Sequence, residues 1–239
     1  MASSTLPAFQ VEQLDFSEAV TVNVGEGDAK QQFLLHKNII SRHSKFFRAA
    51  FSGNFAESKD KSIELPEADP AIFKIWIQWA YSGNMALLSA SEQEVGHENY
   101  ALLARRCGEL YVLADTLEDT LCRNTATDLL RNRFLGFVGP SVHLYQIAYE
   151  STPEGSKLRK VCLDWMLASS PGTWLAQHRN ELPTALFVDL AIEWEQVDFD
   201  SSHFVRISDA PKCEYHDHDK ELPACKEEPK ETSVDKKKA

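Results

Sequence analysis

The first clear pattern in the chain is an alternation of apolar and polar residues near its start. Val20, Val22 and Val24 are separated by polar residues, which predicts a β-strand with one buried face. Residues 25–28, Gly-Glu-Gly-Asp, predict a turn, and residues 31–35 predict a second strand that pairs back on the first. The two glycines are also compatible with a phosphate loop, but no Gly-Lys-Ser/Thr follows them, so we expect a plain hairpin.

The next stretch changes to the spacing of a helix. Apolar residues recur at every third or fourth position over residues 39–51, and Ser44 is a predicted N-cap because its hydroxyl can accept an unpaired backbone N–H. Residues 62–65 alternate like a short strand that Pro66 ends. Pro70 then begins a helix that is apolar nearly all round, so we expect this helix to lie inside the fold.

The rest of the chain predicts helices without further strands. Residues 84–99 are polar and predict a loop, after which residues 100–117 and 119–134 each carry an apolar stripe. Glycines and a proline at 136–140 mark a boundary, and Ser141 is the predicted N-cap of the next helix. Two longer helices over about 158–167 and 183–194 should pack on the preceding ones. From residue 201 charged residues dominate, which predicts a disordered tail.

Charge and composition exclude several classes of function. The formal net charge of −11 argues against nucleic acid as a partner, because phosphate contacts require clustered Lys and Arg. There is no apolar run of bilayer-spanning length and no signal pattern, so we expect no membrane contact and an intracellular location, cytoplasmic or nuclear. The five cysteines are then expected to be thiols, with Cys107, Cys122 and Cys162 as core residues.

Motifs for catalysis are missing from the sequence. It contains no G-x-S-x-G, Walker or H-E-x-x-H pattern. His36 stands at a predicted strand-to-helix junction, where a partly buried structural histidine is the favoured interpretation over a catalytic one. Asp115, Glu118 and Asp119 are best explained as a capped, solvated helix start. The sequence therefore predicts a protein that is not an enzyme and has no small-molecule substrate.

The most chemically suggestive residues lie in the charged tail. Two thiols and two imidazoles, which suit tetrahedral zinc, occur within a short stretch: Cys213, His216, His218 and Cys225. The C-x2-H spacing fits a metal knuckle, whereas H-x-H and the lone later cysteine are unusual for one closed site. The alternative is a plain disordered acidic segment. Zinc binding is therefore a hypothesis, with a zinc-dependent enzyme as its remote variant.

Together these patterns resemble a BTB/POZ domain. The resemblance covers about half of the chain and depends on the order and spacing of many positions. It implies an α+β fold, a small mixed sheet flanked by helices, at residues 16–137 after a flexible lead-in at 1–15. Residues 138–200 are similar to the helical extension of fungal BTB proteins, and 201–239 form the tail. The positions that carry the resemblance are 20–22, Phe33, His36, Lys37, Ser44, Phe46, Phe47, Phe51, 55–58, 63–65, Phe73 and 81–83.

The resemblance implies a role in protein–protein interaction, most specifically as an oligomerising adaptor that recruits a substrate to a cullin-type ubiquitin ligase. In the family, a hydrophobic-x-Glu triplet is associated with cullin docking, and here it holds Phe55 and Glu57; the alternative is that Phe55 packs inward and Glu57 is solvated. Many dimers of the family have a buried Asp–Arg pair at the seam between the two copies. The two aligned positions in this chain are Ala19 and His43, so the pair is absent and a homo-oligomer would need an apolar seam. The alternative function is a scaffold or transcriptional co-regulator that self-associates without a cullin.

Overall fold

The small sheet at one end of the molecule forms as the alternating pattern predicts. The computed structural model describes residues 15–52, 60–88, 97–134, 141–169, 172–196 and 210–225. Strand β1 (Ala19–Val24) lies between β2 (Gln31–His36), to which it is antiparallel, and β3 (Ser62–Leu65), to which it is parallel. The predicted hairpin is confirmed, with Val22 opposite Phe33 and the three alternating valines buried.

The predicted N-cap at Ser44 is confirmed and has a second role. It separates α1 (Lys37–His43) from α2 (Lys45–Ser52), and its Oγ accepts a hydrogen bond from the Phe47 backbone N–H at 3.0 Å. The same hydroxyl donates to the Leu117 carbonyl oxygen at 2.6 Å. Ser44 is fully buried, so this one side chain joins the start of α2 to a turn more than 70 residues away.

The apolar helix predicted from Pro70 is the centre of the N-terminal core. Helix α4 (Pro70–Ser82) begins after Asp69, whose side chain accepts from the Ala71 N–H at 2.6 Å, and ends at Gly83, which has a φ of 69°. Phe73 and Trp76 are completely buried and stack with their ring centroids 5.5 Å apart. Trp76 Nε1 donates to Asp119 Oδ2 at 3.1 Å, so α4 is also tied to the helices that follow.

The predicted helices after the sheet are present, with small shifts at their ends, and the short helix α9 is present besides them. They are α5 (His97–Thr116), α6 (Thr120–Phe134), α7 (Val142–Glu150), α8 (Lys157–Ser169), α9 (Gly172–His178) and α10 (Thr184–Gln196). Helix α5 begins inside the region predicted as a loop. Ser141 is the N-cap of α7, but its hydroxyl makes no capping bond. The predicted cap at the start of α6 is confirmed, because Asp119 Oδ1 accepts from the Cys122 N–H at 2.9 Å, whereas its predicted solvation is wrong, because Asp119 is only 1% exposed.

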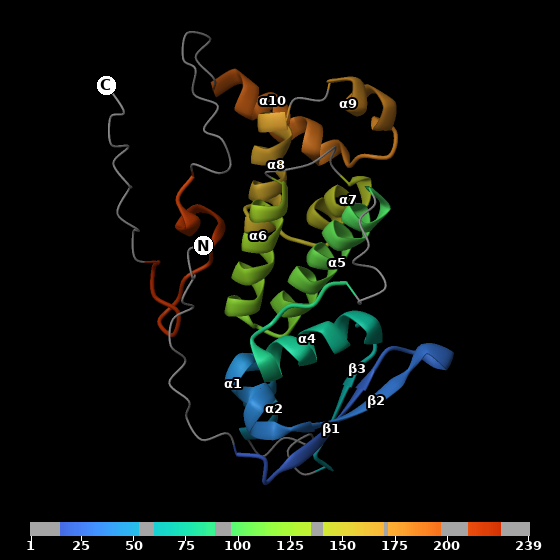
Figure 1. Cartoon of the computed structure of the whole chain (residues 1–239), viewed down its shortest axis with the longest axis vertical. Helices are drawn as coiled ribbons and strands as arrows, with labels where there is room; N and C mark the ends of the chain where they lie inside the picture. The colour runs from blue at the N-terminus through green and yellow to red at the C-terminus, as the bar shows by residue number, and fades with distance from the viewer. Residues whose placement is uncertain are drawn as a thin grey trace, which may run out of the picture.

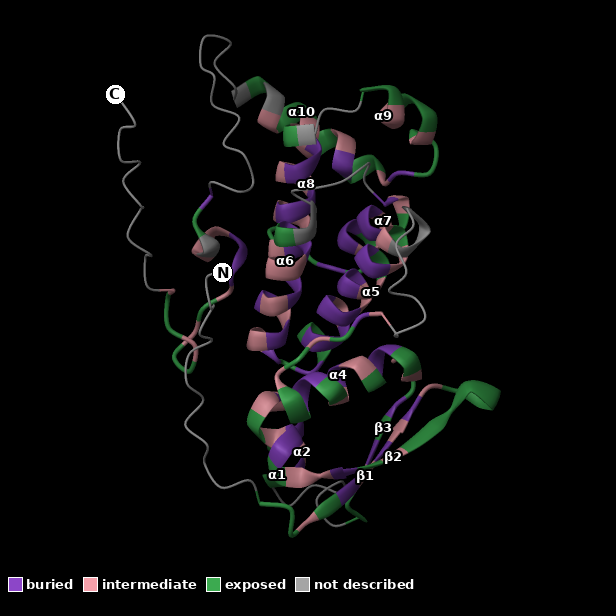
Figure 2. Ribbon diagram, viewed as in Figure 1, coloured by how far each residue is buried: buried purple, intermediate pink, exposed green. Residues whose placement is uncertain are grey.

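These elements stack along the long axis of the molecule. The sheet, α1, α2 and α4 lie at one end, α5 to α8 in the middle, and α9 and α10 at the other end (Figure 1). Buried residues face inward along the whole length and form one hydrophobic cluster (Figure 2). Gly108 of α5 lets α7 approach closely, because a Cβ there would lie 3.0 Å from Leu144 Cδ1. The extension therefore shares its core with the N-terminal half.

The prediction of a disordered tail is wrong for residues 210–225. This segment contains the 3-10 turn η3 (Lys212–Tyr215) and runs beside α6 and α8 (Figure 1). Tyr215 is only 1% exposed, and its hydroxyl donates to Asp164 Oδ2 at 2.8 Å. Asn124 of α6 both donates to the Asp217 carbonyl and accepts from its N–H, each at 2.9 Å. Tertiary hydrogen bonds and one aromatic anchor thus order a segment whose composition is typical of disorder.

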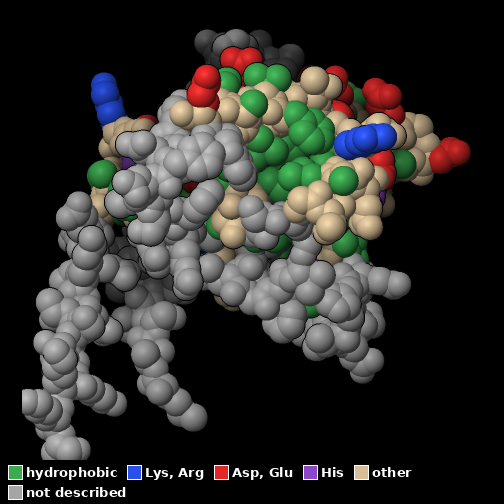
Figure 3. Space-filling view, turned by 90° about the horizontal axis from the view of Figure 1, so that it is seen from above, with side chains coloured by type: hydrophobic (Ala, Val, Ile, Leu, Met, Phe, Trp, Pro, Cys, Tyr) green, Lys and Arg blue, Asp and Glu red, His purple; other side chains and the backbone are tan. Residues whose placement is uncertain are grey.

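The far end of the extension presents apolar surface. Hydrophobic side chains gather there in a patch bordered by acidic ones (Figure 3). On α10, Val188 and Ile192 are 52% and 48% exposed and one helical turn apart.

Within the described residues, no helix combines the length and the low polarity needed to cross a bilayer.

Candidate functional site

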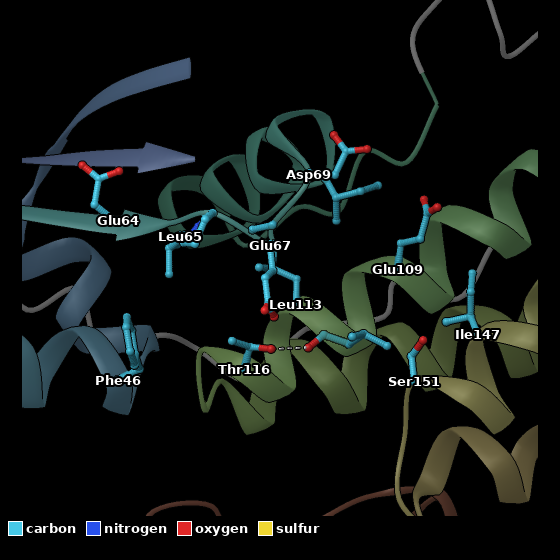
Figure 4. Close-up of a pocket in the computed structure, with 14 residues that line it drawn as sticks. Phe46, Glu64, Leu65, Glu67, Asp69, Glu109, Leu113, Thr116, Ile147 and Ser151 are labelled. Atoms are coloured by element: carbon cyan, nitrogen blue, oxygen red, sulfur yellow. Dashed lines mark hydrogen bonds between the residues drawn. The ribbon is translucent and has the colours of Figure 1, made fainter. Parts of the chain in front are cut away.

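A groove opens where the sheet end of the molecule meets the helical extension. It has a volume of about 590 Å³ and lies between the β3–α4 connection, α5 and α7 (Figure 4). Apolar side chains from five elements form its floor and walls: Phe46, Leu65, Ile72, Val112, Leu113 and Ile147. Thr116 lies at the lower edge, and its Oγ1 donates to the Val112 carbonyl at 3.2 Å. Side chains of both halves of the chain are therefore needed to build this groove.

The rim of the groove is acidic. Glu64, Glu67, Asp69 and Glu109 all border it (Figure 4). Two of these carboxylates are already paired, Glu64 with Lys30 at 2.8 Å and Glu109 with Arg105 at 2.7 Å. The hydrogen bond from Lys30 holds the pKa of Glu64 below its usual value, so this carboxylate stays charged. An apolar trough with an acidic rim suits a protein segment that presents apolar and basic side chains.

The residues predicted for cullin docking cannot be placed beside this groove. Phe55 and Glu57 belong to residues 53–59, which are outside the described part of the chain. They follow α2, which contributes Phe46 to the groove, and precede β3, which contributes Glu64 and Leu65. Their role in docking stays a prediction.

The two residues predicted at a self-association seam lie in different settings. Ala19 is the exposed first residue of β1 and pairs with His36 of β2. His43 ends α1, with its ring 6.2 Å from the Trp79 ring of α4, and burial together with Arg42 lowers its pKa. Near the same end, Phe16 and Leu34 are large apolar residues that are 55% and 74% exposed. Self-association at this seam stays a prediction.

His36 has the surroundings of a structural histidine. Its Nδ1 lies 3.0 Å from the Tyr81 hydroxyl, and that hydroxyl also accepts from the His36 backbone N–H at 2.9 Å. Its ring packs edge-on against Phe16, at 5.0 Å between centroids. The strand-to-helix junction is thereby fixed to the end of α4, in agreement with the favoured interpretation.

The four predicted zinc ligands lie close together. The two sulfurs of Cys213 and Cys225 and a ring nitrogen of His218 are all within 4.8 Å of one another. His216 Nδ1 lies 3.1 Å from Cys225 Sγ. The sequence did not indicate that Asp128 of α6 also belongs to this cluster, with its Oδ1 3.0 Å from His216 Nε2. Asp128 carries no local signal, because an acidic residue on a helix is ordinarily solvated.

The three cysteines of the helices are core residues, as predicted. Cys107, Cys122 and Cys162 are at most 1% exposed. Burial raises the pKa of the Cys122 and Cys162 thiols far above the ordinary value, so both remain protonated at neutral pH. These thiols therefore pack as small apolar side chains.

Comparison with known proteins agrees with the fold. The family model of the BTB/POZ domain matches residues 12–123, which ends inside α6 and before the boundary predicted at residue 137. Kelch repeat and BTB domain-containing protein 2 of Homo sapiens is 31% identical over 90 residues, which are 38% of this chain and 14% of that protein. Kelch-like protein 30 of Mus musculus is 26% identical over 107 residues, 43% of this chain and 17% of that protein. The chain thus aligns with a small part of these curated relatives.

Proposed function

We propose that this chain, in which residues 12–123 form a BTB/POZ domain, is a protein-interaction adaptor whose docking surface is the groove between that domain and the helical extension. The observation that carries the proposal is the composite nature of the groove. The BTB/POZ region supplies Leu65 and Ile72, and the extension supplies Ile147 and Ser151. A partner in the groove would contact both parts of the chain, so its binding would depend on their fixed arrangement.

The charge of the rim specifies the kind of partner. Two of the four rim carboxylates, Glu64 and Glu109, already form ion pairs. Glu67 projects from the exposed β3–α4 connection. We expect the partner to be a protein segment, helical or extended, with an apolar face flanked by Lys or Arg. Each apolar side chain buried in the trough would contribute roughly 1.5–3 kcal/mol, while the acidic rim would set orientation and on-rate.

The finer proposal is that the partner is the N-terminal region of a cullin. It is supported by the resemblance of Phe55 and Glu57 to the docking triplet of cullin-binding BTB domains. A second surface of the chain, on the helical extension or the tail, would then hold a substrate.

A binding assay with the full-length chain tests this function. Purified cullin N-terminal region would be titrated against the parent chain and against Phe55→Ala, Glu57→Ala, Glu67→Lys and Thr116→Arg. We expect each variant to weaken binding at least about 5-fold, since about 1 kcal/mol is lost with one buried anchor or one complementary charge. Glu26→Lys, an equal charge reversal at the exposed hairpin turn, is the matched control and should bind like the parent.

The variants separate the two levels of the proposal. Cullin binding that is insensitive to Glu67→Lys and Thr116→Arg would contradict the groove as the docking surface. An absence of cullin binding would remove the ligase role.

The second candidate, a self-associating scaffold, is favoured by Leu34, which is exposed on β2 at the edge of the described sheet. It predicts a dimer in sedimentation that Leu34→Asp converts to a monomer.

A further inference from the structure

The segment 210–225 has little apolar material to hold it in place. Among its described side chains, only Ala210, Tyr215 and His216 are buried. The Tyr215 ring contacts two cations, with its centroid 5.4 Å from the Arg131 guanidinium carbon and 5.9 Å from Lys160 Nζ. This anchor fixes the first part of the segment. The part after Tyr215 is polar, and it is held by hydrogen bonds and ion pairs from Asn124, Lys45 and Arg48 to Asp217, Asp219 and Glu221.

The backbone of this second part turns back on the first. Asp219 Oδ1 accepts from the N–H groups of Glu221 and Leu222, each at 2.8 Å, and so forms a tight turn. After the turn, the Cys225 backbone N–H donates to Cys213 Sγ at 3.1 Å. Two cysteines that are twelve residues apart are thus brought side by side.

The donor atoms have the spacing of a tetrahedral zinc shell. With Zn–S near 2.3 Å and Zn–N near 2.0 Å, neighbouring ligand atoms lie roughly 3.3–3.8 Å apart. Cys225 Sγ is 3.1 Å from His216 Nδ1 and 4.0 Å from His218 Nε2. Cys213, His218 and Cys225 offer donor atoms that are all within 4.8 Å of one another. His216 is outside this group of three and reaches it through Cys225, so its ring would have to move further than the other donors to join one ion.

A carboxylate from another element supports the same assignment. His216 is 9% exposed, and its Nε2 lies 3.0 Å from Asp128 Oδ1 on α6. Metal-binding histidines usually present the nitrogen that does not bind the metal to a carboxylate or carbonyl, which fixes the ring and its tautomer. The Asp128 carboxylate lies beside Nε2 without a hydrogen bond of good geometry, while Nδ1 is the ring nitrogen that faces Cys225 Sγ.

We propose that Cys213, His216, His218 and Cys225 bind one zinc ion in a structural site that closes the C-terminal segment on itself beside α6. Two thiolates and two imidazoles form a donor set that selects zinc over hard cations. A disulfide between the two cysteines would leave both imidazoles beside the sulfurs without a role. With four protein ligands the site is closed, which opposes the zinc-dependent enzyme considered from the sequence.

Metal content of the full-length chain is the first test. We expect about one zinc ion per chain after purification without chelator, measured by atomic emission. Replacement by cobalt(II) should give the visible bands of tetrahedral coordination and a thiolate charge-transfer band. Cys213→Ser and His218→Ala should lose at least about 10-fold in metal affinity, in line with the loss of a ligand. His143→Ala removes another exposed histidine, on α7, and is the matched control that should keep the zinc.

Limited proteolysis supplies a second measurement. Lys220 is exposed in the turn, and trypsin should cut there slowly in the zinc form and at least about 10-fold faster after chelation. In Cys213→Ser the cut should be fast with or without chelator, while the helical content stays at the parent level. Zinc-free parent protein that fails to bind cobalt(II), or a Cys213–Cys225 disulfide found by mass spectrometry after purification under reducing conditions, would overturn the proposal. Neither result would bear on partner binding in the groove.

Discussion

At the scale of single residues, buried polar side chains join parts of the chain that are far apart in sequence. Asp119 is the best example, because Oδ1 caps α6 at the Cys122 N–H and Oδ2 accepts from Trp76 Nε1 of α4. It is 1% exposed, and burial raises its pKa from 3.8 to about 6 in spite of these two bonds. The folded state therefore binds a proton here more tightly than the unfolded state does.

This pKa shift predicts a pH-dependent stability that Asp119→Asn should remove. Because the folded-state pKa is the higher one, the contribution of Asp119 to the free energy of unfolding falls as pH rises from about 4 to about 6, by at most about 3 kcal/mol. The asparagine variant does not titrate, and its NH₂ group cannot accept from Trp76 Nε1. We expect a deficit of about 1 kcal/mol against the parent at pH 4.5 that vanishes or reverses at pH 7.

Urea denaturation at both pH values measures this difference. Asp28→Asn, at an exposed carboxylate in the hairpin turn, serves as the control and should follow the parent throughout. A deficit of Asp119→Asn that is the same at both pH values would show that the side chain acts through its hydrogen bonds alone.

At the scale of elements, the sequence predicted what depends on local signals. Ser44 and Pro70 mark helix starts through backbone chemistry that is the same in any fold, and Val22 lies in an alternation that only a strand satisfies. The folding of residues 210–225 was missed, because Tyr215 becomes an anchor only where α6 and α8 supply its cations. The residues of the proposed zinc site were chosen from residue type, whereas Asp128 and the groove residues required the tertiary arrangement.

The crossing of α5 and α7 gives a prediction about packing. A Cβ at Gly108 would lie 3.0 Å from Leu144 Cδ1 and 3.3 Å from Ile147 Cγ2. Gly108→Val adds two further carbons there, so we expect a loss of about 1–3 kcal/mol in the free energy of unfolding although valine is the better helix former. Ala101→Val, at an exposed position of the same helix, should change the free energy of unfolding by less than about 1 kcal/mol. Equal denaturation midpoints for the two variants would contradict a close helix crossing at Gly108.

At the scale of the whole molecule, the BTB/POZ region and the extension are expected to unfold together. One hydrophobic cluster runs from Val20 of β1 to Leu186 of α10, and Leu144, Tyr145 and Leu158 of the extension are fully buried in it. Truncation after residue 137 would remove these side chains and expose the face of α5 that they cover. At roughly 1.5–3 kcal/mol for each buried apolar side chain, we expect a loss of at least about 3 kcal/mol or failure to fold.

Chemical denaturation of three chains tests this coupling. The full-length chain should unfold in one transition, seen at the same denaturant concentration by tryptophan fluorescence and circular dichroism. A chain that ends at residue 209 lacks the segment held by Tyr215 but keeps α7 to α10, so its midpoint should lie below that of the full-length chain and above that of the chain ending at residue 137. If the shortest chain unfolded at the midpoint of the full-length chain, the two parts would be independent domains. The groove would then lie between bodies free to move, and a partner that spans it would bind with an added cost in ordering them.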